Sequence, residues 1–242
     1  SIQNFAKFEI EINRKVHLIL LILKDFYKKS PVTTALIFLV LLMVIITYLT
    51  GGFSVGNLLS LGALDPVLVK NGEYYRLFTV MFLHGSMEHF LSNTVIGLFV
   101  LSGTLERLIK PFKFAVLYIV AGLGASLFIV FSSNETIPGF DVTVGASGAI
   151  FAVLGCLLYI SIFRHDLIHQ AERKSIFALI GIQMVFTFVT PMISIPGHVG
   201  GLISGFLLSF LLISRKTPVI EEPYMKQTYE DILDSYDEDK YY

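Results

Sequence analysis

One serine and one histidine, 51 residues apart, have surroundings that suit catalysis. Ser147 lies in Gly145-Ala146-Ser147-Gly148 and opens an apolar run, and His198 opens another with glycines close behind it. A serine hydroxyl is a weak nucleophile until an adjacent base takes its proton, and histidine is the usual base. The pair predicts serine-nucleophile chemistry at the ends of two membrane helices.

A second polar group lies earlier, in His84, His89 and Asn93. His89 and Asn93 are four residues apart and therefore share one helix face. An amide and a neutral imidazole N–H suit an oxyanion hole, as does the backbone N–H of Ser147 at a helix start. The alternative is a metal site of His84, His89 and His198. It is disfavoured because no carboxylate stands at a convincing ligand spacing.

The composition is that of an integral membrane protein. Of 242 residues, 54% are hydrophobic and 15% are charged, against roughly 25% charged in soluble domains. A net charge of -1 argues against a nucleic-acid partner. The single cysteine, Cys156, excludes a disulfide within the chain and, lying in an apolar run, is predicted to be buried and inert.

Six apolar runs can position these residues, and they predict an all-α membrane protein with six spans. The runs are 32–50, 86–103, 112–131, 147–163, 175–190 and 198–214. The link 51–85 is long and rich in apolar residues, so we expect it to be folded. Small residues four apart in the fourth and sixth runs, among them Gly148, Gly201 and Gly205, predict close contact between those two helices.

We expect three regions. Residues 1–31 form a cytoplasmic segment with an amphipathic helix that lies on the membrane surface. Residues 32–214 form the six-span core. Residues 215–242 form an acidic tail that the composition predicts to be disordered.

Lysine and arginine placement predicts the orientation. Sixteen of them fall on the side of both termini, and only Lys70 and Arg76 fall on the other. Positively charged links stay in the cytoplasm, so both termini are predicted to be cytoplasmic. Ser147 and His198 then lie at the outer ends of their spans, on the same side as His89 and Asn93.

These residues together resemble the rhomboid intramembrane serine proteases. The matching motifs are Gly145-x-Ser147-Gly148, His198-x-x-Gly201-x-x-x-Gly205, and His84, His89 and Asn93 at the spacing of the second-span motif. Tyr75-Arg76 is similar to the family's first-loop Trp-Arg pair, and Leu105-Glu106-Arg107 to the acidic end of its second span. The resemblance covers roughly residues 32–214.

The resemblance implies a role for each residue. Ser147 would be the nucleophile and His198 the general base and acid, without a third acidic member. His89, Asn93 and the Ser147 backbone N–H would form the oxyanion hole. Supporting roles would fall to residues around them, which are Gly145, Phe151, His84, Gly148, Gly201, Gly205, Arg76 and Glu106. We expect a water-filled cavity lined by the catalytic and oxyanion residues together with His84.

Two residues depart from the family pattern. Tyr75 stands where tryptophan is usual, which is expected to loosen the first loop. Phe151 stands where a tyrosine often stacks against the histidine, so the aromatic face is kept and the hydroxyl is lost.

The expected function is therefore cleavage of single-span or multi-span membrane proteins in a prokaryotic plasma membrane, at a site open to the extracytoplasmic side. No metal or other cofactor is expected, and the oligomeric state is not predicted. Two alternatives stay open: a pseudoprotease that binds membrane spans without cutting them, and a small transporter or channel.

Overall fold

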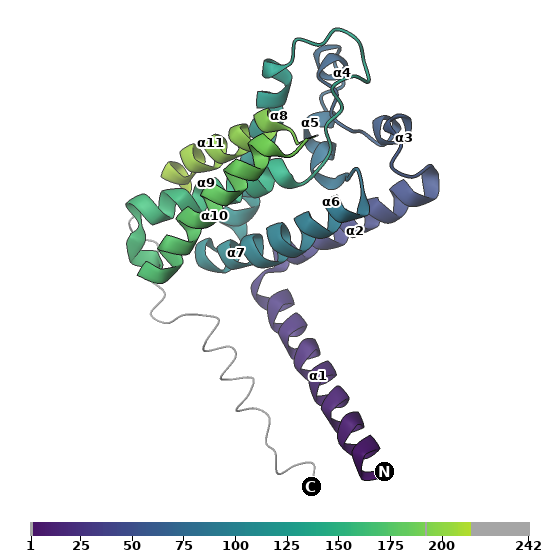
Figure 1. The fold of residues 1–242 in the computed structure, drawn as a ribbon. Coiled ribbons are helices and arrows are strands. Elements are labelled where there is room, and N and C mark those ends of the chain that lie inside the picture. The colour runs from purple at the N-terminus through teal and green to yellow at the C-terminus, as the bar shows by residue number, and fades with distance from the viewer. Residues whose placement is uncertain (1, 192, 214–242) are drawn as a thin grey trace.

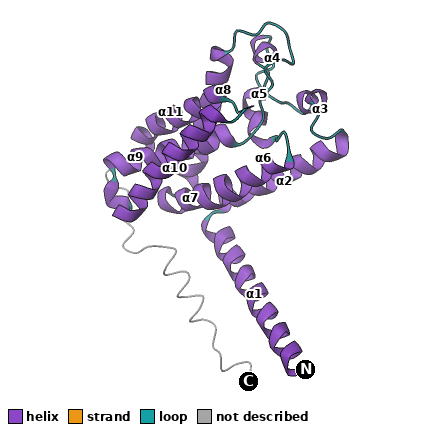
Figure 2. Ribbon diagram, in the orientation of Figure 1, coloured by secondary structure: helices purple, strands orange, loops and turns teal. Residues whose placement is uncertain are grey.

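The computed structural model describes residues 2–191 and 193–213, and in this part of the chain helices are joined by loops and turns, without a strand (Figure 2). The predicted acidic tail, 215–242, lies outside the described residues. In chain order the elements are α1 (Ile2–Lys29), α2 (Pro31–Thr50), α3 (Val55–Ser60), α4 (Pro66–Lys70), α5 (Arg76–Thr79), η1 (Val80–Phe82), α6 (Met87–Ser92), η2 (Asn93–Ser102), α7 (Gly103–Ile109), α8 (Pro111–Ser132), α9 (Ser147–Phe163), η3 (His165–Leu167), α10 (Gln170–Val189) and α11 (Ile195–Leu212).

Among the described residues, three helices are long and apolar enough to cross a membrane, namely α2, α8 and α11, and α9 is a shorter apolar helix of 17 residues. Their bounds agree with four of the predicted spans to within a few residues. Proline in the first turn begins α2, α8 and α11, because it fixes a helical φ where the missing N–H has no intrahelical partner.

The predicted span 86–103 differs most from a simple helix. It consists of α6, the ten-residue π-helix η2 and the first residue of α7, which follow one another without a break. A π-helix this long is unusual, since most are single-turn bulges within α-helices. Asn93 is the first residue of η2, so the π-helix starts at a predicted site residue.

Helix α9 forms the centre of the bundle, packed against α8 and α11 (Figure 1). Twelve of its 17 residues are buried. Helix α10 lies at the edge, because Thr187 alone of its 20 residues is buried. The start of α9 carries Ser147, so the most buried helix positions the predicted nucleophile.

Close contact between α9 and α11 depends on their small residues, as the spacing predicts. A Cβ on Gly201 would overlap the Gly148 carbonyl oxygen, and one on Gly205 would overlap the Ala152 carbonyl oxygen. In a membrane, helices gain little from excluding lipid, and contact between small residues supplies van der Waals packing instead.

Helix α1 projects from the bundle with the N-terminus at its far end (Figure 1). Near its C-terminal end Phe26 is buried and stacks on Phe99, with the ring centroids 4.4 Å apart. Apolar side chains such as Leu20 and Leu23 are exposed along it. The position of this helix on the membrane surface stays a prediction.

Candidate active site

Ser147 and His198 come from different helices and line the same small cavity. Ser147 is the first residue of α9 and is half-buried, and His198 lies in the first turn of α11 and is 8% exposed. The cavity has a volume of about 20 Å³, enough for roughly one water molecule. A hydroxyl, an imidazole and room for about one water molecule therefore share one small space.

The rest of the cavity wall differs from the prediction. His84, His89 and Asn93 do not line it, and helix α8 lines it instead. The α8 residues are Gly122, Ala125, Ser126 and Ile129, and further lining comes from Val80, Met81, Thr143, Gly145, Gly148, Ala149, Ser194 and Gly197. A role for α8 in this wall could not be predicted, because its residues carry no group that suggests catalysis.

His89 and Asn93 lie against the Gly145 backbone, two residues before Ser147. A Cβ on Gly145 would come within 2.8 Å of His89 Cε1 and Nε2, and 3.5 Å of Asn93 Nδ2. Gly145 has a φ of +133° and its N–H donates to the Val80 carbonyl at 3.0 Å. Only glycine adopts this conformation readily, so it lets the chain pass close to both polar side chains.

His84 is fully buried beside this pair. The Asn93 Nδ2 and the His84 Nε2 are 3.1 Å apart, and the ring centroids of His84 and His89 are 5.0 Å apart in an edge-to-face arrangement. An amide nitrogen has two hydrogens, so one can bond His84 while the other stays available. His84 thereby orients the Asn93 amide.

The ring of His198 is held on its face and on its edge. Phe151 stacks on it with centroids 3.9 Å apart and planes 17° apart. The Thr187 Oγ1 in α10 is 2.8 Å from His198 Nδ1. Sequence reasoning missed Thr187; the only signal was a hydroxyl residue within the predicted span 175–190.

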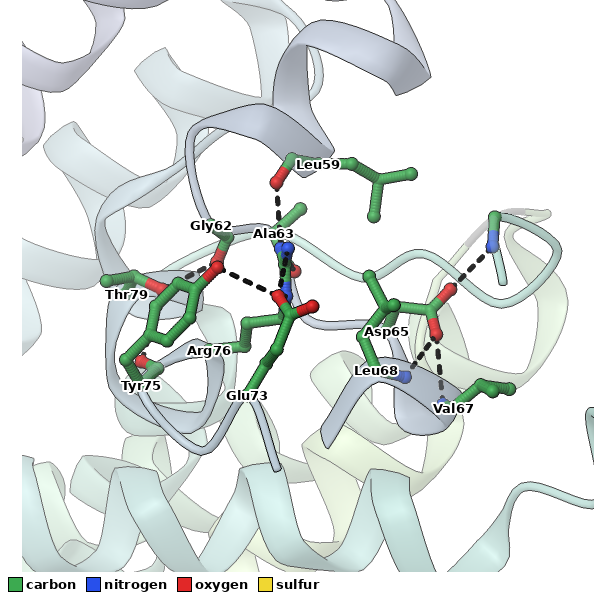
Figure 3. A network of polar contacts seen from close by, with 11 residues as sticks. Leu59, Gly62, Ala63, Asp65, Val67, Leu68, Glu73, Tyr75, Arg76 and Thr79 are labelled. Carbon is green, nitrogen blue, oxygen red and sulfur yellow. Dashed lines mark hydrogen bonds and ion pairs between the residues drawn. The ribbon is translucent and has the colours of Figure 1, made fainter. Parts of the chain in front are cut away.

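Arg76 organises the first link (Figure 3) and does not line the cavity. It is 5% exposed, and its Nη1 donates to the carbonyls of Leu59 and Ala63, each at 2.8 Å. Its Nε and Nη2 bind the Glu73 carboxylate at 2.8 and 2.7 Å. The hydrogen bond from Arg76 lowers the pKa of Glu73 below its ordinary value, with a smaller contribution from Tyr75.

Tyr75 contacts both Glu73 and Arg76 within this link. Its hydroxyl donates to Glu73 Oε2 at 2.9 Å, and its ring lies 5.2 Å from the Arg76 guanidinium carbon. The link is also fixed to the segment before Ser147: Leu64 and Thr143 exchange two backbone hydrogen bonds, and Asp65 Oδ2 accepts from the Gly139 N–H at 2.6 Å.

Glu106 lies in α7 and does not line the cavity. It is fully buried and accepts hydrogen bonds from the N–H groups of Val32 at 2.8 Å and Thr33 at 2.7 Å. The N-cap residue of α2, Ser30, makes no side-chain cap bond of its own, so a carboxylate from α7 satisfies the helix start. Glu106 supports the fold and does not join the site.

A metal site has no support in the described residues. No group of three or more His, Cys, Asp or Glu side chains gathers there in a way that would hold an ion. Cys156 is buried within α9.

Comparison with known proteins finds rhomboid relatives. The rhomboid domain matches residues 71–215. The putative rhomboid protease YdcA of Bacillus subtilis is 36% identical over 148 residues, which are 61% of this chain and 72% of that protein. The rhomboid protease GluP of the same organism is 32% identical over 186 residues, 76% of this chain and 35% of that protein.

A relative described as inactive also matches. Inactive rhomboid protein 1 of Bos taurus is 30% identical over 143 residues, which are 58% of this chain and 16% of that protein. Similarity in this range therefore extends to proteins described as proteases and to one described as inactive. The rhomboid domain covers more than half of the sequence, and the chain belongs to the rhomboid family of integral membrane proteins.

Proposed function

We propose that this protein is an intramembrane serine endopeptidase that cleaves other membrane proteins in or near their membrane spans. The observation that carries the proposal is the shared cavity of Ser147 and His198. Two helices in backbone contact present a hydroxyl and an imidazole to one water-sized space. A serine hydrolase needs these three components.

The proposed reaction proceeds through an acyl-enzyme. Ser147 Oγ attacks the carbonyl carbon of the scissile bond, and its proton passes to His198. His198 then gives this proton to the leaving amine as the C–N bond breaks. A water molecule attacks the resulting ester, its proton passes to His198 and then to Ser147 Oγ, and the carboxylic acid product leaves.

The negative charge on the tetrahedral intermediate would be stabilised by three N–H donors. The backbone N–H of Ser147 is one of the unpaired donors of the α9 N-terminus. His89 and the second hydrogen of the Asn93 amide supply the others, and both side chains lie against Gly145 beside the nucleophile. Fixed donors of this kind are commonly worth a factor of roughly 10²–10³ each in rate.

We further propose six membrane spans with both termini in the cytoplasm and a site open to the extracytoplasmic side of a prokaryotic plasma membrane. The length and apolarity needed for spanning are present in α2, α8 and α11, and α9 is apolar but shorter. The segment α6–η2–α7 and α10 would be the other two spans. The distribution of lysine and arginine supports the orientation.

A pseudoprotease that binds spans without cutting is the second candidate, favoured only by the inactive relative. A fluorophosphonate probe separates the two, because it reacts only with an activated serine. Wild type should be labelled and Ser147→Ala should not. Unlabelled wild type, or equal labelling of both, would contradict the protease. Mapping the cut in a membrane-protein substrate by mass spectrometry, with His198→Ala as a second inactive control, then gives the cleavage site.

A further inference from the structure

Thr187 is the only buried residue of α10, and it touches His198. Its side chain is 1% exposed. Its Oγ1 donates to the Gln183 carbonyl at 2.8 Å and lies 2.8 Å from His198 Nδ1. A hydroxyl buried in an otherwise peripheral helix thus meets the proposed general base.

The two hydrogen bonds together select one tautomer of His198. A threonine hydroxyl has one proton and can accept through its lone pairs. When that proton goes to the Gln183 carbonyl, the bond to His198 forms only if Nδ1 carries the hydrogen. His198 Nε2 is then unprotonated, which is the state that a general base requires.

The opposite tautomer of His198 makes one hydrogen bond fewer with Thr187 and cannot act as the base. With Nδ1 unprotonated, the Thr187 proton can satisfy either the Gln183 carbonyl or the ring nitrogen, and not both. His198 Nε2 would then carry a hydrogen and could not accept the proton of Ser147.

We propose that Thr187 is a positioning residue that fixes the catalytic tautomer and the in-plane rotation of His198, an inference that rests on the proposed function. In Ser-His-Asp enzymes a carboxylate has this role; here a neutral hydroxyl has it. Phe151 fixes the face of the ring and Thr187 fixes its edge. The bond strengthens when His198 becomes an imidazolium, because charge-assisted hydrogen bonds are stronger.

This assignment makes the base depend on the position of α10. Apart from Thr187, α10 packs against the core through partly buried side chains, among them Ile176, Leu179 and Met184, whereas twelve residues of α9 are buried. Movement of α10 away from α11 breaks the bond to His198 Nδ1. The enzyme is therefore fully competent only while α10 is docked.

The test compares Thr187→Val, which keeps the shape and removes the hydroxyl, with Thr187→Ser, which keeps the hydroxyl. Thr47→Val is the matched control, because Thr47 is also buried in a helix and bonds the carbonyl four residues earlier, that of Met43. We expect Thr187→Val to lower kcat and the fluorophosphonate labelling rate by roughly 10- to 100-fold with KM unchanged. Thr187→Ser should recover most of the loss, and Thr47→Val should match wild type.

A measurement without substrate tests the same inference. In protein labelled with ¹⁵N-histidine, the ring shifts of His198, assigned by their absence in His198→Asn, should report the Nδ1–H tautomer in wild type. They should report a mixture or the Nε2–H tautomer in Thr187→Val. If Thr187→Val does not fold, Thr187→Ala replaces it. Wild-type kinetics and an unchanged tautomer in the variant would overturn the assignment. Absent labelling of wild type would instead overturn the proposed function, while the tautomer measurement would still decide whether Thr187 fixes the ring.

Discussion

At the scale of single residues, Gly145 combines a backbone conformation that favours glycine with close contact to the polar side chains near Ser147. Its φ of +133° and its contact with His89 both require the absence of a side chain. A methyl group here would strain the backbone and press on a proposed oxyanion donor within the same local structure.

Gly145→Ala should therefore lower kcat/KM by about 100-fold or more, because displacing catalytic groups by about 1 Å has costs of that order. Cleavage of a membrane-protein substrate in detergent measures it. Gly72→Ala is the matched control, since Gly72 has a φ of +107° but nothing within 4 Å of its position for a Cβ. Equal losses in the two variants would mean that backbone strain alone, and not the contact with His89, is responsible.

Phe151→Tyr should change turnover by less than about tenfold, because the stacked ring face is kept and one added hydrogen bond is worth about 0.5–1.5 kcal/mol. Phe151→Leu, which removes the ring, should cost more. Both are measured as kcat on the same substrate. A rise of several orders of magnitude in Phe151→Tyr would show that the hydroxyl is needed.

Some residues of the candidate active site could be predicted from the sequence, and others could not. Ser147 and His198 stood out because small residues flank each of them at the start of an apolar run. Thr187 did not, because a threonine in a membrane helix most often bonds its own backbone. Its contact with His198 depends on how α10 packs, which the local sequence does not encode.

At the scale of elements, the contact between α9 and α11 brings the two proposed catalytic residues together. Backbone carbonyls of α9 fill the spaces where side chains of α11 would otherwise lie. These carbonyls cannot rotate away as a side chain can, so the contact has little tolerance for added volume.

Gly205→Ala should destabilise the protein by about 1–3 kcal/mol, the usual cost of overpacking, since the new Cβ would overlap the Ala152 carbonyl oxygen. Gly181→Ala, in α10 with nothing within 4 Å, should be neutral or stabilising by up to about 1 kcal/mol. Denaturant unfolding in micelles compares the two. A similar change in both variants would contradict the packing account.

The positions of the long helices were more predictable than the π-helix within one span and the start of α10. Apolar length indicated α2, α8 and α11 to within a few residues. The π-helix η2 was not predictable, because its residues are ordinary helix formers. Helix α10 begins at Gln170, before the predicted start at 175, because Glu172 accepts the His169 N–H at 2.9 Å and caps a polar first turn.

At the scale of the whole molecule, the long first link and the segment before Ser147 form one connected structure at the end of the bundle that carries the site (Figure 1). The Leu64–Thr143 pairing and the Asp65–Gly139 hydrogen bond join them. The sequence indicated that the link is folded, but the pairing of residues so far apart had no local signature.

The proposed orientation predicts which links a membrane-impermeant maleimide can reach. Cys156 is the only cysteine and is buried, so the native chain is a suitable background for single cysteines. In intact cells Glu135→Cys should react and Lys174→Cys should not, whereas both should react after permeabilisation. Labelling of Lys174→Cys alone in intact cells would reverse the orientation, and labelling of both would contradict the assignment of these links to opposite sides.

The placement of His198 in α11 also has a consequence for biosynthesis. Helices enter the membrane in the order of their translation, and α11 is the last helix of the described chain. A partly made chain holds Ser147 but has neither its proposed base nor the helix that closes the cavity. On the proposed function, a nascent chain gains the ability to cut neighbouring membrane proteins only after α11 is inserted.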